Sequence, residues 1–144
     1  PQTPFYAQSG GQVGDQGEIS WPEGTFIVQS TRAAADGLVL HTGVVTAGTL
    51  VTGQQVVLQV DEQRKATALN HTATHLLQAA MKQVLGDHVK QAGSLVRPDR
   101  LRFDFTHFSP VTPEEIREIE QLVNREIRRN VPVTTDILSK EAAI

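Results

Sequence analysis

The spacing of apolar residues changes once along this chain, near residues 61–65, and the change divides the sequence into two regions. Before it, short runs rich in Val, Ile, Thr and Phe alternate with glycines, a pattern typical of β-strands and turns. After it, apolar residues recur with the 3.6-residue period of a helix. The segment between them, DEQRK, is charged. The sequence therefore predicts an α+β protein, with a β-lobe over residues 1–63 and a second region over residues 64–144.

Glycines divide the first 60 residues into short segments. The clearest predicted strands are residues 25–31, 38–41 and 55–60, and residues 35–37 are expected to form the hairpin turn between the first two. This spacing favours a small antiparallel barrel or sandwich.

The first predicted helix covers residues 64–85 and ends at Gly86, a glycine in the position typical of a helix C-terminus. At about 100° per residue, a histidine pair lies on one face and an apolar stripe lies on the opposite face. The histidine face comprises Thr67, His71, Thr74, His75, Gln78 and Lys82, and the apolar stripe comprises Ala66, Leu69, Ala73, Leu76, Leu77, Ala80 and Val84. We therefore expect His71 and His75 to point away from the core.

The segment after this helix is predicted to be a loop over residues 88–94, followed by an extended stretch and a turn at residues 97–100. Residues 101–106 alternate apolar with polar side chains, as a half-buried strand does.

A second helix is predicted to begin after Thr112, with Pro113 at its first position. Glu115 is the third residue of this helix, where its side chain can accept a hydrogen bond from the backbone N–H of Thr112. Its buried stripe is predicted to consist of Ile116, Ile119, Val123 and Ile127. Residues 131–136 are predicted to form an edge strand, because Pro132 cannot donate to a ladder. Residues 141–144 resemble the start of a further helix, so we expect the chain to be a piece of a longer protein.

Composition narrows the functional classes. The absence of cysteine excludes disulfides and thiolate metal sites built from this chain alone, and it suits a reducing compartment, so the cytoplasm is the expected location. A formal net charge of −3 creates no overall attraction for a polyanion, so any contact with nucleic acid has to be local. No apolar run approaches the roughly 18 residues of a membrane span, and no membrane partner is expected.

The histidine pair permits two interpretations. Histidines at positions i and i+4 of a helix can each direct a ring nitrogen toward one point, as two metal ligands must. A metalloprotease would carry glutamate directly after the first histidine, where this chain has Thr72, so that class is disfavoured. A nucleophile triad is disfavoured too, because neither Ser9 nor Ser94 lies in a nucleophile elbow. A metal site and a pair of surface histidines therefore remain equally open from the residues alone.

Four motifs occur in a fixed order along almost the whole chain. They are PFYAQSGGQVGD (residues 4–15), NHTATHLL (70–77), QAGSLV (91–96) and LRFDF (101–105). Together they resemble the editing region of bacterial-type alanyl-tRNA synthetases. The resemblance implies a small translation-factor-like β-barrel followed by the N-terminal part of a two-layer α+β editing core, of the type shared with threonyl-tRNA synthetases.

The same resemblance implies an activity: hydrolysis of the ester that joins serine or glycine to the alanine-specific tRNA. A synthetic site made for alanine cannot exclude glycine by size and rejects an added hydroxyl poorly, so a second, hydrolytic site is needed. By the resemblance, His71 and His75 match the first half of the family's zinc site. Thr74 matches a threonine that recognises the wrong side chain, and Gln91 matches a glutamine of the editing pocket.

The glycine-rich loop has two interpretations as well. By the resemblance, Gly10, Gly11 and Gln12 match an element that packs beside the editing pocket and contacts substrate. The loop can also be a plain tight turn. Four arginines are candidates for contact with tRNA phosphate and equally for ordinary surface positions: Arg97, Arg100, Arg128 and Arg129. Arg102 with Asp104 is expected to be a solvated or locally paired charge set.

This chain departs from the family in one respect. The family completes its zinc site with a Cys-x-x-x-His pair well downstream, which this chain does not contain. We therefore expect the chain to bind zinc weakly or not at all and to have impaired deacylation. We also expect an exposed, truncated core that favours a homodimer. The alternatives are a free-standing trans-editing deacylase and a non-catalytic tRNA-binding module with the same fold.

Overall fold

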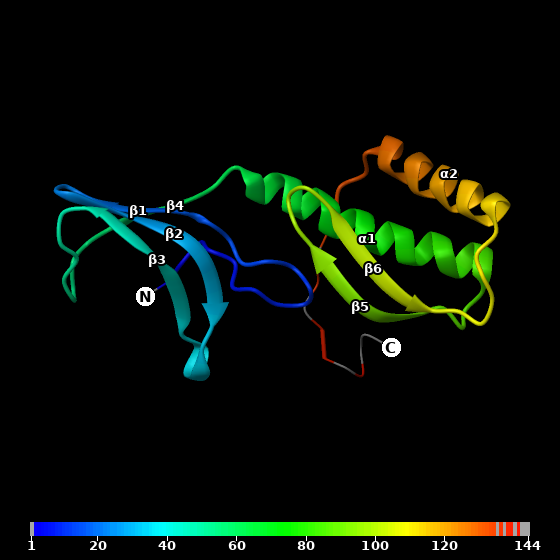
Figure 1. Ribbon diagram of the computed structural model, residues 1–144, viewed down its shortest axis with the longest axis horizontal. Coiled ribbons are helices and arrows are strands. Elements are labelled where there is room, and N and C mark those ends of the chain that lie inside the picture. Colours follow the sequence, from blue (N-terminus) through cyan, green and yellow to red (C-terminus); the bar gives the residue numbers. More distant parts are fainter. Residues whose placement is uncertain (1, 135, 137, 140, 142–144) are drawn as a thin grey trace.

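The computed structural model describes residues 2–134, 136, 138, 139 and 141. Its elements run in the order β1 (Gly17–Trp21), β2 (Gly24–Ala33), the 3-10 turn η1 (Ala35–Gly37), β3 (Val39–Ala47), β4 (Val57–Val60), α1 (Gln63–Leu85), β5 (Lys90–Val96), β6 (Leu101–Thr106) and α2 (Pro113–Arg129). Strands β1 to β4 form a β-lobe, and the two helices with the β5–β6 hairpin form a second region (Figure 1). The predicted α+β class is confirmed. Within the described residues, no helix is long and apolar enough to cross a membrane.

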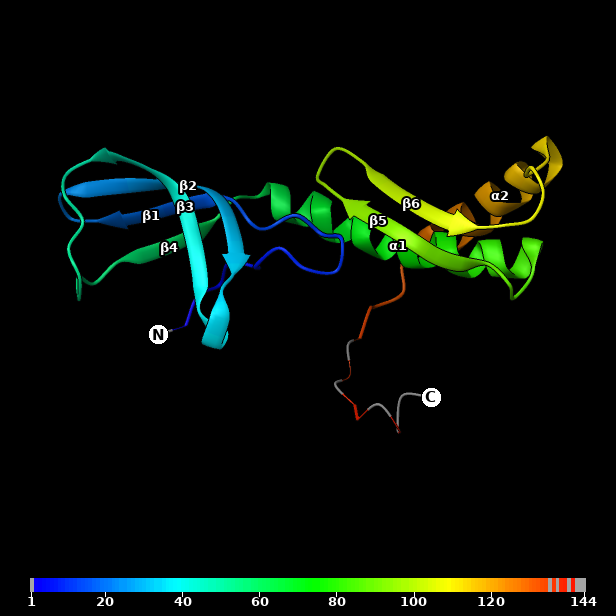
Figure 2. The ribbon, with the colours of Figure 1, turned by 60° about the horizontal axis from the view of Figure 1, so that its bottom comes forward.

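The β-lobe is an open antiparallel sheet with strand order β3-β2-β1-β4. Register shifts between Thr25 and Phe26 and between Val28 and Ser30 interrupt the β2–β3 ladder, and β2 and β3 curve away from β1 (Figure 2). Bulges of this kind bend a sheet. The sheet does not close into a barrel among the described residues, because β3 and β4 remain its two edges and do not pair.

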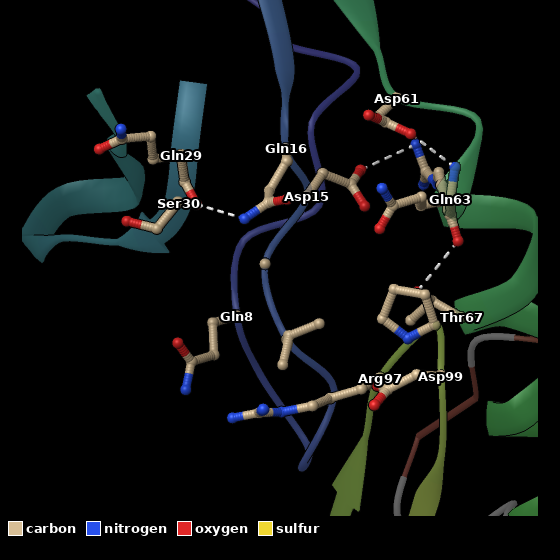
Figure 3. A pocket seen from close by; sticks show the side chains of 14 residues that line it. Gln8, Asp15, Gln16, Gln29, Ser30, Asp61, Gln63, Thr67, Arg97 and Asp99 are labelled. Carbon is tan, nitrogen blue, oxygen red and sulfur yellow. Dashed lines mark hydrogen bonds and ion pairs between the residues drawn. The ribbon is translucent and has the colours of Figure 1, made fainter. Parts of the chain in front are cut away.

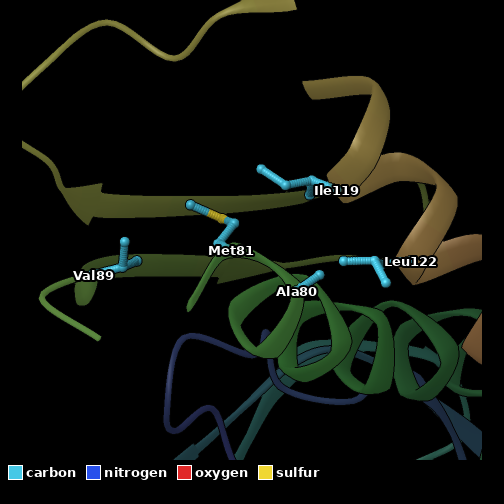
Figure 4. Packing of buried hydrophobic residues seen from close by; sticks show 5 residues of the cluster. All are labelled: Ala80, Met81, Val89, Ile119 and Leu122. Carbon is cyan, nitrogen blue, oxygen red and sulfur yellow. The ribbon is translucent and has the colours of Figure 1, made fainter. Parts of the chain in front are cut away.

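The second region packs two helices against one face of the β5–β6 hairpin (Figures 1 and 2). A two-stranded sheet is only marginally stable alone, and helix packing supplies the burial it lacks. The core cluster comprises Ala80, Met81, Val89, Ile119 and Leu122, with Phe103 and Phe105 of β6 among the side chains packed on it (Figure 4).

The two predicted helices are confirmed with small shifts. The helix α1 begins at Gln63 rather than residue 64 and ends at Leu85, and the N–H of the following Gly86 donates to the Lys82 carbonyl. The helix α2 has a complete capping box: the Glu115 N–H donates to the Thr112 hydroxyl (3.2 Å) and the Thr112 N–H donates to the Glu115 carboxylate (2.7 Å). These caps satisfy backbone groups that a helix leaves free at its ends.

The predicted buried faces of both helices need correction. On α1, Leu77, Ala80 and Val84 of the predicted apolar stripe belong to the core or pack against it. Thr67 and Thr74 of the predicted histidine face are buried as well, whereas Leu69 is 72% exposed. The core therefore extends from the predicted stripe to the edge of the histidine face. On α2, Ile116 and Ile127 are about half exposed, and Leu122 takes the buried position beside Ile119.

Two extended segments also differ from expectation. The predicted loop at residues 88–94 is largely the strand β5, which begins at Lys90. The predicted edge strand at residues 131–136 is wrong for residues 131–134 and 136, which join no strand, and residue 135 lies outside the described residues. The predicted helix start at residues 141–144 falls on residues of which only 141 is described, and 141 is a turn.

Candidate functional site

The glycine-rich loop, residues 8–13, joins the β-lobe to the second region. The Gln8 N–H donates to the Thr31 carbonyl of β2 (2.9 Å). On the other side, the Val96 N–H of β5 donates to the Gly11 carbonyl (2.8 Å), and the Val13 N–H donates to the Val96 carbonyl (3.1 Å). Backbone hydrogen bonds therefore attach this loop to both sheets.

Glycine is required at one position of the loop for two separate reasons. Gly11 has φ +83°, a backbone conformation that side chains with a Cβ rarely adopt. A Cβ at Gly11 would also lie 2.8 Å from the backbone oxygen of Ser94. Gly10 has φ +57° as well, but no atom lies within 4 Å of where its Cβ would be. The loop can thus lie directly on β5 only because Gly11 has no side chain.

This close approach brings Gln12 against the helix α1. The Gln12 side chain is only 8% exposed, and its Oε1 lies 2.6 Å from Nδ1 of His71. An amide oxygen can only accept a hydrogen bond, so this contact requires the proton of the neutral imidazole on Nδ1. The lone pair of His71 then lies on Nε2, where it can accept a proton or bind a metal.

His75 stacks on His71 one helical turn further along. The ring centroids are 5.2 Å apart and the planes are 14° from parallel. His75 is exposed and His71 is half-buried. Over the described part of the chain, no three side chains of His, Cys, Asp or Glu are grouped so that they could hold a metal ion. The residues present therefore supply two ligands of the four that a structural zinc ion requires, and they do not fit a complete zinc site.

Thr74 lies beside this pair on α1, and its side chain is buried. The residue is 5% exposed, and its hydroxyl donates to the carbonyl of Asn70 (2.8 Å). This bond to the preceding helical turn satisfies the hydroxyl proton without a partner from another element. The oxygen of Thr74 keeps its capacity to accept a hydrogen bond.

Gln91 lies on β5 and its side chain is exposed. A register shift directly follows it, between Gln91 and Gly93. Among the described residues, no hydrogen bond joins Gln91 to His71 or Thr74. The structure thus brings Gln12, His71, Thr74 and His75 together and leaves Gln91 apart from them.

A polar cavity of about 480 Å³ lies on the other side of the same loop (Figure 3). Its walls are residues of the loop and of β2, the start of α1, and the turn at residues 97–100. Asp15 is nearly fully buried there: its carboxylate lies 3.2 Å from the Arg64 guanidinium and accepts the Tyr6 N–H (2.7 Å). The sequence patterns gave no sign of the Asp15–Arg64 pair or of the Gln12–His71 contact, because both join residues 49 or more positions apart.

The remaining charged candidates lie elsewhere. Arg102 and Asp104 form an ion pair (3.2 Å) on the exposed side of β6, as the expected locally paired charge set. Arg128 and Arg129 lie in the last turn of α2, where positive charge suits the helix dipole, and Arg129 pairs with Glu126 (2.7 Å).

Comparisons with known proteins agree on one family. Residues 1–64 match the model for class II (A) tRNA synthetases. The alanine–tRNA ligase of Methylococcus capsulatus is 56% identical over 144 residues, which is 99% of this chain and 17% of that relative. The alanine–tRNA ligases of Thermotoga petrophila (54%, covering 99% of this chain and 17% of the relative) and Thermus thermophilus (53%, covering 99% and 16%) match similarly. The chain thus spans about a sixth of the length of the relatives it matches, and it belongs to the alanyl-tRNA synthetase family.

Proposed function

We propose that this chain is part of the editing region of an alanine–tRNA ligase, which hydrolyses the ester that joins serine or glycine to alanine-specific tRNA. The observation that carries the proposal is the contact between Gln12 and His71 beside Thr74. Three positions that match the family's site come together there, although they belong to segments about 60 residues apart. In this view, the β-lobe is the family's barrel and the second region is the first part of its editing core.

Hydrolysis of an aminoacyl ester requires a water molecule held for attack and a means of selecting the wrong side chain. The Nε2 lone pair of His71 can accept a hydrogen bond from that water, because Gln12 holds the ring proton on Nδ1. The Thr74 oxygen can accept a hydrogen bond from the hydroxyl of serine. Because Thr74 is buried, this recognition requires the surrounding side chains to move when substrate binds. Gln91 is assigned to positioning the ester or the attacking water.

Zinc belongs to the proposed site of the full-length enzyme, but this chain is expected to bind it weakly. A complete structural zinc site contributes roughly 10 kcal/mol or more, which corresponds to a Kd below about 0.1 μM. With ligands only from His71 and His75, we expect a Kd above that value and no stoichiometric zinc after dialysis. Metal analysis and calorimetric titration measure both quantities. Stoichiometric zinc that survives dialysis would contradict the expectation, and the double variant H71A/H75A serves as the control.

The activity itself is best tested in two proteins in parallel. In the full-length Methylococcus capsulatus relative, we expect the substitution that matches His71→Ala to slow the hydrolysis of Ser-tRNA by about a hundredfold, the usual contribution of a group that handles the proton of water. The match to His88→Ala is the control, because His88 hydrogen-bonds His107 at the far end of α1. Unchanged hydrolysis in the first variant would refute the proposal.

The isolated chain is expected to hydrolyse Ser-tRNA slowly, with or without added zinc. Complete absence of hydrolysis together with retained tRNA binding would favour the alternative of a tRNA-binding module. The proposed enzyme acts in the cytoplasm. Self-association remains a prediction, which sedimentation velocity can test. Such a dimer would bury half-exposed apolar side chains of α2 such as Ile116 and Ile127.

A further inference from the structure

The polar cavity beside the glycine-rich loop contains an arginine, Arg97, whose guanidinium has no partner among the described residues. Arg97 lines the cavity, and Figure 3 shows its side chain directed toward Gln8. The other arginine of the lining, Arg64, pairs with the buried carboxylate of Asp15 and donates to the Pro4 carbonyl (2.8 Å). In the described part of the chain, no hydrogen bond or ion pair engages the guanidinium of Arg97. A free guanidinium at a cavity wall is suited to a phosphate group, which it can bind through two parallel hydrogen bonds.

The turn that carries Arg97 is fixed to the helix that carries His71. The Asn70 side-chain amide donates to the carbonyls of Arg97 (2.8 Å) and Pro98 (3.2 Å). The Arg97 N–H donates to the carbonyl of Arg100 (2.9 Å), which closes the turn. The backbone of Arg97 is therefore held next to Asn70, the residue directly before His71.

The remaining lining is suited to a sugar. Asp61 and Asp99 place carboxylates in the same cavity, and Ser30 and Gln8 add neutral polar groups. Two carboxylates in the same cavity as the guanidinium of Arg97 disfavour a bare anion, but they can accept hydrogen bonds from ribose hydroxyls. Phosphate and vicinal hydroxyls occur together in the backbone of RNA, and a volume of about 480 Å³ is within the range of small-ligand sites.

The cavity also lies at a suitable distance from the proposed hydrolytic site. Thr67 lines the cavity, and His71 is four residues further along α1, which is a rise of about 6 Å on the same helix face. Gln12 and the cavity lie on opposite sides of the glycine-rich loop, so a strand bound in the cavity would pass over this loop to place its next nucleotide beside His71 and Gln12.

We propose that this cavity binds one ribose-phosphate unit of the RNA strand whose end carries the ester, with Arg97 contacting the phosphate and Asp61 or Asp99 the ribose hydroxyls. The inference rests on the proposed function for the identity of the RNA. By this inference, Arg97 contacts the phosphate and Arg100, in the same turn, does not. Arg100 lies outside the cavity lining, and its guanidinium is 3.9 Å from the Asp99 carboxylate.

The test measures the binding of an RNA hairpin that contains the acceptor stem and single-stranded 3′ end of an alanine tRNA, with a free 3′ hydroxyl, to the 144-residue chain. Fluorescence anisotropy over a series of salt concentrations gives both the affinity and its salt dependence. For Arg97→Gln, we expect binding about fivefold weaker and a logarithmic salt slope smaller by about 0.7–0.9, the value for one phosphate contact. Arg100→Gln is the matched control and should change neither quantity appreciably.

A second variant guards against an indirect effect of the first. Gln8→Glu adds a carboxylate to the cavity wall at an exposed position, and it should weaken RNA binding while the melting temperature stays the same. Equal losses for Arg97→Gln and Arg100→Gln, no loss for either, or no measurable binding by the unaltered chain would overturn the inference. The chain could instead bind AMP with micromolar affinity. If Arg97→Gln abolished that binding and left RNA binding unaffected, the cavity would be a free-nucleotide site and the inference would be overturned.

The proposed function is judged separately, because a hairpin with a free 3′ hydroxyl has no ester to hydrolyse. Ser-tRNA hydrolysis that is lost in the variant matching His71→Ala, with Arg97→Gln having no effect on RNA binding, would reject this inference alone. Loss of RNA affinity in Arg97→Gln, without ester hydrolysis by the full-length relative, would reject the hydrolytic function and leave the RNA site standing.

Discussion

Replacement of Gln12 by alanine tests the contact on which the candidate site depends. The substitution removes the hydrogen bond to His71 together with the buried Cγ methylene and the carboxamide of the glutamine side chain. A hydrogen bond between neutral groups contributes about 1 kcal/mol, and one buried methylene contributes roughly 0.8 kcal/mol. His71 is half-buried, so water can reach its freed Nδ1 and no further penalty is expected. The free energy of unfolding should therefore fall by about 2 kcal/mol.

Urea denaturation measures this difference directly, and thermal melting should show a decrease in Tm of roughly 4–8 °C for a chain of 144 residues. Gln8→Ala is the matched control, because Gln8 is an exposed glutamine of the same loop that bonds β2 through its backbone. Nitrogen-15 NMR of the imidazole adds a readout that stability alone lacks. At neutral pH the unaltered chain should carry the His71 proton on Nδ1, and the variant should lose this preference.

A Gln12→Ala variant no less stable than Gln8→Ala would contradict a stabilising contact between Gln12 and His71. A His71 ring protonated on Nε2 in the unaltered chain would contradict the assigned direction of the hydrogen bond, because the glutamine would then face His71 with its amino group. That arrangement would remove the Nε2 lone pair from the site.

Three further predictions concern the glycine-rich loop, the cap of α2 and His41. Gly11→Ala should destabilise the chain more than Gly10→Ala in urea denaturation, since both strain a positive φ by about 1–2 kcal/mol but only the first meets Ser94; equal effects would contradict the close packing. Thr112→Ala should lower the free energy of unfolding by about 1 kcal/mol through loss of the α2 cap, with reduced helix content by circular dichroism as the check. Burial lowers the pKa of His41 from its ordinary 6.5, so the unfolded chain takes up the proton first and stability should fall as pH drops from about 6.5 through the folded pKa. His41→Gln should reduce this fall in Tm, and an unchanged pH profile would count against the assignment.

The sequence predicted the helices well because their ends are specified locally. Thr112, Pro113 and Glu115 lie within four residues of each other and define the start of α2, and Gly86 defines the end of α1. The start of β5 was missed because Ala92 and Gly93 resemble a loop in sequence. Their strand conformation depends on pairing with β6, which a local pattern cannot reveal.

Three residues of α1 differ in burial from the prediction for a different physical reason. Thr67 and Thr74 appear polar in the sequence, but each hydroxyl donates to a carbonyl of its own helix four residues earlier. Each can therefore be buried without leaving an unpaired donor. Leu69 conversely appears to belong to the core and is mostly exposed, since nothing in the described residues covers that part of α1. Residue type alone therefore fails to predict burial where a polar side chain forms its hydrogen bond within its own helix.

The glycine-rich loop explains why the histidine pair and the polar cavity belong to one arrangement. Gln12 faces His71 on one side of the loop, and Gln8, Val13 and Gly14 line the cavity on the other. The backbone of this short segment is bonded to Thr31 of the β-lobe and to Val96 of the second region, so neither side can shift without moving the loop. A movement of the lobe against α1 would change the Gln12–His71 distance and the shape of the cavity together. Binding of RNA in the cavity should accordingly alter the imidazole signals of His71, although His71 lies outside the cavity lining.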